Sequence, residues 1–185
     1  ARRFKHERMN NGLLVTGNKH VKKIATATNT SFEAINKAAD EMVDLLVVHH
    51  PSWEWADQDN HESKLRFLEK SSISLYVAHD SMDCLPEAGM GDCLAKELGV
   101  KVEGRFADWN VTPWMKREGD KAVENAYVGV YGSPEKDVSY DVFVKSAERK
   151  LGCRIEGWKA RDILKRIGII PGSGLESIWV REAKE

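Results

Sequence analysis

Apolar and polar positions alternate along the first hundred residues in blocks that predict strands and helices in turn. A β-prone run covers 22–29, and Thr30-Ser-Phe-Glu33 predicts a capping box at the start of a helix, with the Thr30 hydroxyl on the helix amides. The apolar residues of that helix fall at the spacing of one buried face: Ile35, Ala38, Ala39 and Met42. The next predicted elements are a strand over 44–48, a helix near 61–70, a strand over 73–78, and a helix over 89–99 that Gly99 ends.

This β-α-β-α-β-α order predicts parallel strands joined by crossover helices. The strand at 44–48 is apolar throughout, as expected when both faces of a strand are covered. After residue 99 the pattern weakens and predicts shorter elements: strands over 100–106, 127–131, 153–158 and 167–170, and helices over 139–151 and 175–185.

These elements predict an α/β fold, with a mixed, largely parallel sheet flanked by helices and a smaller second α+β part. We expect an α/β metal-site domain over residues 1–105 and a second α+β part over 106–185. The chain stops inside a predicted helix, so we expect the second part to be truncated at its C-terminus.

Composition describes an ordinary globular chain. Of its 185 residues 42% are hydrophobic and 31% charged, and the net charge is -1, so charge gives no argument for a nucleic-acid or membrane partner. The longest apolar runs have strand length, and no secretion signal opens the chain. We therefore expect no nucleic-acid partner and no membrane contact.

Histidines follow two of the predicted parallel strands where each strand ends. His49-His50-Pro51 follows the strand at 44–48, and His79 follows the strand at 73–78. Parallel strands share one carboxyl edge and neighbours lie about 4.8 Å apart, so these side chains can converge there. Consecutive strand residues point to opposite faces, so His49 and His50 can diverge and reach different points, which suits two metals roughly 3.5–4 Å apart. Imidazoles that merely cap a strand are the alternative, and we favour the metal site.

His79-x-x-x-Asp83 is the second motif of this edge. Asp83 can fold back as a metal ligand, while His79 either binds the metal or orients Asp83 through a hydrogen bond. Asp80 we interpret as a turn or cap residue. Imidazole and carboxylate together suit zinc, iron, manganese or cobalt and disfavour a calcium site. Two or three histidines and one carboxylate cannot fill the coordination of two ions. Solvent or ligands outside this chain would therefore complete the centre.

Other residues give weaker signals. Pro171-Gly-Ser-Gly174 could hold an anion, although tight-turn geometry explains it as well. Four loop tryptophans could stack on a heterocycle, but such residues more often seal a core edge or an interface: Trp53, Trp55, Trp109 and Trp114. Three histidines have no partners in the sequence, and we expect them at the surface: His6, His20 and His61.

Taken together, the chain resembles the dinuclear metal-centre family of GTP cyclohydrolase 1 type 2, the NIF-three-like family. The matching segments cover nearly the whole chain: Asn11-Gly-Leu-Leu-Val15, 21–27, 39–51 with His-His-Pro, His79-x-x-x-Asp83, the helix at 89–99, and 167–174. The order and spacing of the two histidine motifs carry most of this resemblance.

The resemblance implies that His49, His50 and Asp83 bind two divalent metal ions, with His79 beside them. It also implies a cytoplasmic α/β protein that assembles as a ring-shaped hexamer, with its metals facing an inner cavity. Two features depart from the family. A histidine and a glutamate four residues apart, which complete the family's ligands near the carboxyl end, have no match here, and Asp80 stands where threonine is usual.

We therefore expect a metal-dependent hydrolase that acts on a nucleotide-like substrate. A non-catalytic metal-binding, scaffold or regulatory protein is the alternative, because no general acid or base outside the ligands can be named. A mononuclear iron oxygenase with two histidines and one carboxylate ranks last, because its ligands usually lie on an antiparallel barrel.

Overall fold

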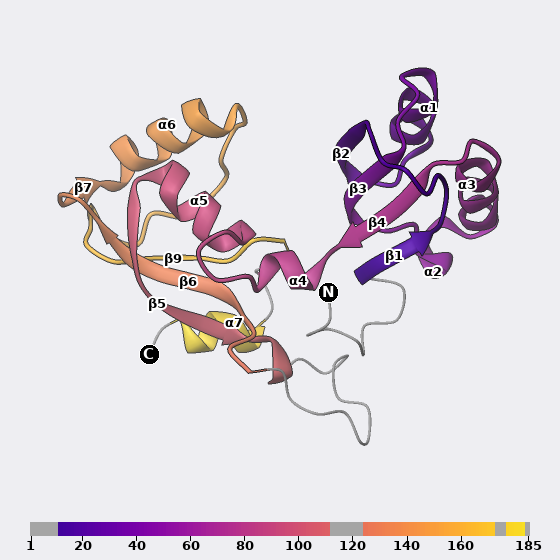
Figure 1. Cartoon of the computed structure of the whole chain (residues 1–185). Helices are drawn as coiled ribbons and strands as arrows, with labels where there is room; N and C mark the ends of the chain where they lie inside the picture. The colour runs from indigo at the N-terminus through magenta and orange to yellow at the C-terminus, as the bar shows by residue number, and fades with distance from the viewer. Residues whose placement is uncertain (1–10, 112–123, 173–176, 184–185) are drawn as a thin grey trace. The chain divides into compact units, whose positions relative to one another are not determined.

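A computed structural model describes residues 11–111, 124–172 and 177–183 of the chain, which folds into two compact units (Figure 1). The division falls between Met82 and Asp83, inside the short helix α4 (Asp80–Asp83). Residue 105, the boundary suggested by the sequence, lies within strand β5 (Val100–Asp108). Because β5 pairs with a later strand, it belongs with the second unit, so the observed division comes earlier in the chain.

The first unit contains a four-stranded sheet with the order β1-β4-β3-β2. Its strands are β1 (Asn11–Val15), β2 (Ile24–Asn29), β3 (Leu45–His50) and β4 (Ser74–Ala78). The three strands β2, β3 and β4 are parallel, as predicted, and β1 is added antiparallel to β4 at one edge. The predicted α/β class with a mixed, largely parallel sheet is therefore confirmed.

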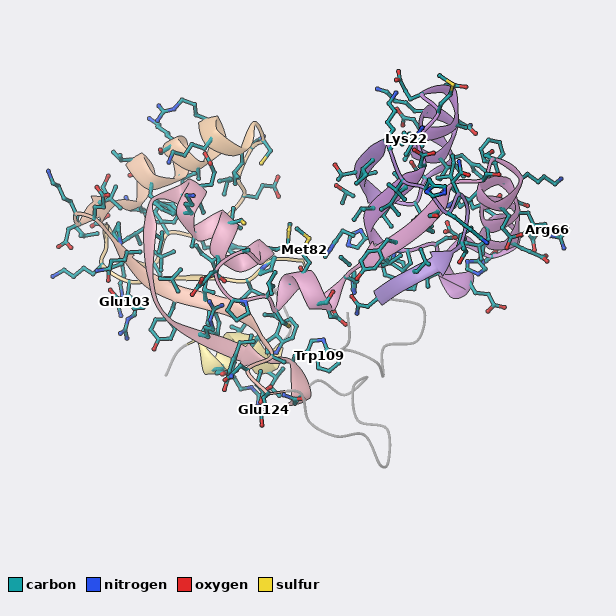
Figure 2. All side chains as sticks on the ribbon, in the orientation of Figure 1. Lys22, Arg66, Met82, Glu103, Trp109 and Glu124 are labelled. Atoms are coloured by element: carbon teal, nitrogen blue, oxygen red, sulfur yellow. The ribbon has the colours of Figure 1, made fainter. Side chains whose placement is uncertain are left out.

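Three helices complete this unit: α1 (Phe32–Asp40), α2 (Glu54–Asp57) and α3 (Asp59–Lys70). Ile35 of α1 and Leu68 of α3 are fully buried in one core with the sheet residues Leu46, Val48, Leu75 and Val77. The alternate residues Leu45 and Val47 are only half-buried, so β3 is buried mainly on one face rather than on both. The exposed side chains of Lys22 and Arg66 project from this unit in Figure 2.

The start and end of α1 differ from the sequence prediction. Ser31, not Thr30, caps the helix, because its Oγ accepts a hydrogen bond from the Ala34 N–H at 3.1 Å. Thr30 is buried and is bonded to β3 instead. At the other end the helix stops at Asp40, and Met42 lies beyond it with a φ of 52° and a side chain 83% exposed. The prediction that Met42 is buried was therefore wrong.

The second unit contains an antiparallel sheet with the order β5-β6-β9, which adds β6 (Tyr127–Pro134) and β9 (Ile167–Ile169) to β5. A two-stranded sheet pairs β7 (Val138–Ser139) with β8 (Ile163–Leu164). The helical elements are α5 (Met90–Leu98), η2 (Trp109–Val111), α6 (Tyr140–Leu151) and α7 (Ser177–Glu182). Ala95, Val100, Val130 and Ile169 form the centre of its core.

Several sequence predictions for this unit can be compared with the structure. Gly99 ends α5 in the left-handed conformation, with a φ of 75°, as predicted. The predicted strand at 153–158 was wrong, since those residues form no strand and Trp158 is 93% exposed. Residues 173–174 of the predicted Gly-Ser-Gly turn lie outside the described residues. Among the helices that the structure describes, none combines the length and the apolar character that a bilayer crossing needs.

Candidate metal centre

Three histidines converge at the carboxyl edge of the parallel strands. His49 and His50 end β3, and His79 directly follows β4, which runs parallel to β3. One ring nitrogen from each lies within 4.8 Å of those of the other two. The ring centroids are 4.6 Å apart for His49 and His50, 4.9 Å for His49 and His79, and 5.4 Å for His50 and His79.

The rings of His49 and His50 therefore lie side by side, although the alternation of a regular strand would allow the two side chains to diverge. His50 is the last residue of β3 and precedes Pro51, so the regular pleat ends here. The two rings also have different partners, since His49 bonds to β4 and His50 bonds to β2.

His49 is oriented by the backbone of β4. Its Nδ1 lies 3.0 Å from the carbonyl oxygen of Ala78. A carbonyl oxygen only accepts hydrogen bonds, so Nδ1 carries the proton, and the neutral ring has its metal-binding lone pair on Nε2. A backbone carbonyl that fixes the tautomer in this way is common behind metal-binding histidines.

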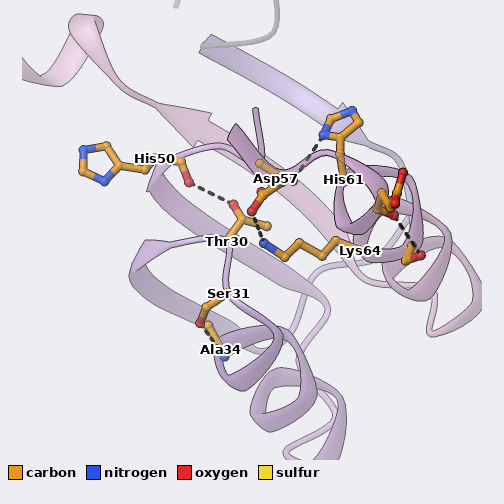
Figure 3. Close-up of polar contacts among 10 residues, drawn as sticks. Thr30, Ser31, Ala34, His50, Asp57, His61 and Lys64 are labelled. Atoms are coloured by element: carbon orange, nitrogen blue, oxygen red, sulfur yellow. Dashed lines mark hydrogen bonds and ion pairs between the residues drawn. The ribbon is translucent and has the colours of Figure 1, made fainter. Parts of the chain in front are cut away.

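His50 is held by the end of β2, because its Nδ1 lies 2.6 Å from Oδ1 of Asn29. Its carbonyl oxygen accepts hydrogen bonds from Thr30 N at 3.1 Å and from Thr30 Oγ1 at 2.9 Å, the second of which is drawn in Figure 3. Burial, together with the neighbouring rings of His49 and His79, lowers the pKa of His50 below its ordinary value. The ring therefore favours the neutral form that a metal requires.

His79 belongs to a second cluster, which helix α4 completes. Oδ1 of Asp80 lies 3.2 Å from its Nδ1, and ligand atoms of His79, Asp80 and Asp83 lie within 4.8 Å of one another. Asp80, interpreted from sequence as a turn or cap residue, thus lies beside Asp83 in this cluster. Metal binding by the four predicted ligands stays a prediction. The structure brings His49, His50 and His79 together at one strand edge and places Asp83 beside His79.

Asn11 of β1 is a residue that sequence reasoning missed at this edge. Its side-chain oxygen accepts hydrogen bonds from the backbone N–H of His79 at 3.0 Å and from the hydroxyl of Ser81 at 2.6 Å. This contact depends on the antiparallel pairing of β1 with β4, which no local pattern around Asn11 signals.

Trp53 lies against the histidines. Its ring centroid is 5.5 Å from that of His50 and 5.5 Å from that of His79, which it meets edge-on at 85°. Trp109 is buried in the second unit, as expected of a residue that seals a core. The side chain of Trp55 and residue Trp114 lie outside the described parts of the chain.

The donor set suits a transition metal. Three imidazoles and two carboxylates, all half-buried, match the ligands preferred by zinc, iron, manganese and cobalt. The hydrogen bonds to Ala78 and Asn29 additionally orient two of the rings. The residues therefore fit a divalent metal ion.

The comparisons with known proteins define the class. The sequence pattern of the Duf34/NIF3 (NGG1p interacting factor 3) family matches residues 2–185, and the chain belongs to this family. A GTP cyclohydrolase 1 type 2 homolog from Deinococcus radiodurans is 28% identical over 174 residues, covering 91% of this chain and 60% of that protein. A protein of the same name from Archaeoglobus fulgidus is 33% identical over 104 residues, covering 54% and 42%.

Solved structures share the fold. TTHA1606 from Thermus thermophilus superposes with a TM-score of 0.70 at 25% identity, covering 94% of this chain and 65% of that one. The protein ybgI, described as of unknown function, gives 0.70 at 24% identity, covering 89% and 61%. A Bacillus cereus protein related to NIF3 gives 0.68 at 15% identity, covering 98% and 76%. The chain spans less than two thirds of the length of the two curated relatives above.

Proposed function

We propose that the histidine edge of the first unit binds divalent metal ions and that the protein is a metal-dependent hydrolase of a small, nucleotide-like molecule. The observation that carries this proposal is the convergence of His49, His50 and His79 within 4.8 Å. The name GTP cyclohydrolase 1 type 2 homolog, which the curated relatives carry, supports a nucleotide as the substrate class.

Such ions, when bound, activate a water molecule for attack and polarise the substrate. The residues of this chain hold and orient them. His49 and His50 present their Nε2 atoms, because Ala78 and Asn29 occupy Nδ1 in each ring. Asp83 would add a carboxylate, and the ring of Trp53 would form one wall of the site.

Two ions are the number we propose. The two clusters, three histidines in one and His79 with two carboxylates in the other, share His79. Two overlapping sets of ligands support two neighbouring metal positions. They do not fill the coordination of both ions, so solvent or another part of the protein would supply the remaining ligands.

We also propose, from the family resemblance, a cytoplasmic protein that assembles as a ring-shaped hexamer around an inner cavity. Sedimentation of the purified protein tests the assembly, with a hexamer expected and a stable monomer as the contrary result.

A comparison of the wild-type protein with His50→Ala tests the activity. Each is reconstituted with zinc, manganese, iron or cobalt and assayed on nucleoside triphosphates by phosphate release and by the purine absorbance, which reports ring opening. Metal-dependent turnover that His50→Ala abolishes, with assembly intact, supports a hydrolase. Stoichiometric metal without turnover on a broad hydrolase panel contradicts it and favours a non-catalytic metal-binding or scaffold protein.

A further inference from the structure

A cluster of buried polar side chains lies beside the metal-binding edge, in the segment that carries Trp53. Ser52 is 2% exposed and Lys64 is 7% exposed. The Ser52 hydroxyl donates to one carboxylate oxygen of Asp57, and Lys64 Nζ donates to the other at 2.8 Å. Nδ1 of His61 lies 3.2 Å from Ser52 Oγ, so His61 is partly buried and bonded rather than a surface residue as expected (Figure 3).

The direction of these hydrogen bonds excludes an activated serine. The Ser52 proton points to Asp57, so Nδ1 of His61 donates its own hydrogen to Ser52 Oγ. A serine nucleophile needs the opposite arrangement, with a histidine that accepts the hydroxyl proton. The cluster therefore holds the backbone in place instead of supplying a nucleophile.

Lys64 is the member of this cluster whose burial is least favourable. A buried ammonium group is unfavourable unless it is paired. Asp57 pairs with it, and the ring of Phe32 lies 5.5 Å from Nζ. Burial alone would raise the pKa of Asp57, but the hydrogen bonds from Lys64 and Ser52 lower it below its usual value. The carboxylate therefore stays charged and accepts both bonds.

The backbone that the cluster holds has little stability of its own. Helix α2 has only four residues and begins after Trp53 without a side-chain cap. The residue between α2 and α3, Gln58, has a φ of 47°, which is unfavourable for a residue with a side chain. Asp57, the last residue of α2, accepts hydrogen bonds from Ser52, which lies before α2, and from Lys64 of α3. These two bonds connect α2 to the chain before it and to the helix after it.

We propose that Lys64, acting through Asp57 and Ser52, positions Trp53 against His50 and His79 and so restrains both imidazoles in the geometry that binds a divalent cation. The inference rests on the proposed function for its metal-binding part. The positioning of Trp53 itself is a property of the metal-free chain. Lys64 is thus proposed as a positioning residue that acts through its bond to Asp57 and not as a metal ligand.

The test uses protein labelled with 5-fluorotryptophan, in which the Trp53 fluorine resonance is assigned by its loss in Trp53→Phe. That resonance is recorded without metal, and the Kd for Zn²⁺ is measured by competition with a chromophoric chelator. The variants are Lys64→Met, Lys64→Arg and Ser52→Ala. Arg66→Met is the matched control, because Arg66 lies on the same helix in an exposed ion pair with Glu62.

We expect Lys64→Met and Ser52→Ala to shift the Trp53 resonance and to raise the Kd roughly tenfold. Lys64→Arg should restore both values toward wild type, and Arg66→Met should change neither. An unchanged resonance in Lys64→Met and Ser52→Ala overturns the positioning role, as does Lys64→Arg behaving like Lys64→Met. If Lys64→Met does not fold by circular dichroism, Ser52→Ala decides by the same criteria. A wild-type chain that binds no Zn²⁺ overturns the metal-binding part, while the resonance still decides whether Trp53 is positioned in this way.

Discussion

Asn29 and His50 face each other at the ends of the neighbouring parallel strands β2 and β3, and the side-chain oxygen of Asn29 lies 2.6 Å from Nδ1 of His50. This bond fixes which ring nitrogen carries the proton, and it turns Nε2 into the nitrogen that can bind a metal. Asn29 lies on β2, a strand that carries none of the predicted ligands, yet it determines which nitrogen of His50 can bind a metal.

Asn29→Ala should therefore weaken Zn²⁺ binding roughly tenfold, because the His50 ring loses its orienting acceptor. Titration calorimetry measures the effect. Asn18→Ala is the control, since Asn18 bonds to Asp44 on the exposed surface and should leave the affinity unchanged. Equal affinities for Asn29→Ala and the wild type would show that the bond does not orient His50.

Thr30→Val should lower the free energy of unfolding by about 1 kcal/mol, because the buried hydroxyl donates to the carbonyl oxygen of His50. Valine keeps the shape and leaves the N–H bond of residue 30 in place. Urea denaturation measures the change, and Thr28→Val on the exposed face of β2 should have little effect. A similar loss in both variants would show that the effect does not come from the hydrogen bond between Thr30 and His50.

His79→Ala should raise the Kd for Co²⁺ at least tenfold and change the visible absorption of bound Co²⁺, because both candidate clusters contain His79. The exposed residue His20 provides the control, and His20→Ala should bind Co²⁺ as the wild type does. An unchanged spectrum in His79→Ala would mean that His79 neither binds nor orients the metal.

The metal-free protein should lose stability as the pH falls below about 6.5, the ordinary pKa of histidine. The pKa of His50 is lowered in the folded state, so the unfolded chain takes up this proton first, and acid favours unfolding until the folded state is protonated as well. His50→Gln should remove that part of the pH dependence. Urea unfolding above and below pH 6.5 checks it, and identical pH profiles for the two proteins would contradict the assignment.

The general position of the site was predictable from sequence because it depends on strand order. Two apolar strands ending in histidine, joined by a crossover helix, must bring those histidines to one edge. The position of His49, His50 and His79 at one edge follows from that rule, but the close approach of the His49 and His50 rings does not.

The contacts that orient the histidines were not predictable, because they join residues far apart in the sequence. Asn11 reaches His79 only through an antiparallel strand that no pattern indicated. The hydroxyl residues at 30–31 correctly predicted that a helix starts there, but the cap was assigned to Thr30 when Ser31 forms it. Thr30 instead donates to the carbonyl oxygen of His50, which is 20 residues away in the sequence. The Lys64 cluster likewise depends on two helices meeting beside the strand end.

Metal content after equilibrium dialysis tests the central claim most directly. The wild-type protein and a His49→Ala/His50→Ala variant are dialysed against the same dilute Zn²⁺ solution, and bound zinc per chain is measured by elemental analysis. Stoichiometric zinc in the wild type, with a large loss in the variant, is the predicted result. Zinc at the level of the dialysis buffer in the wild type, or equal zinc in the two proteins, would contradict a metal site at the His49-His50-His79 edge.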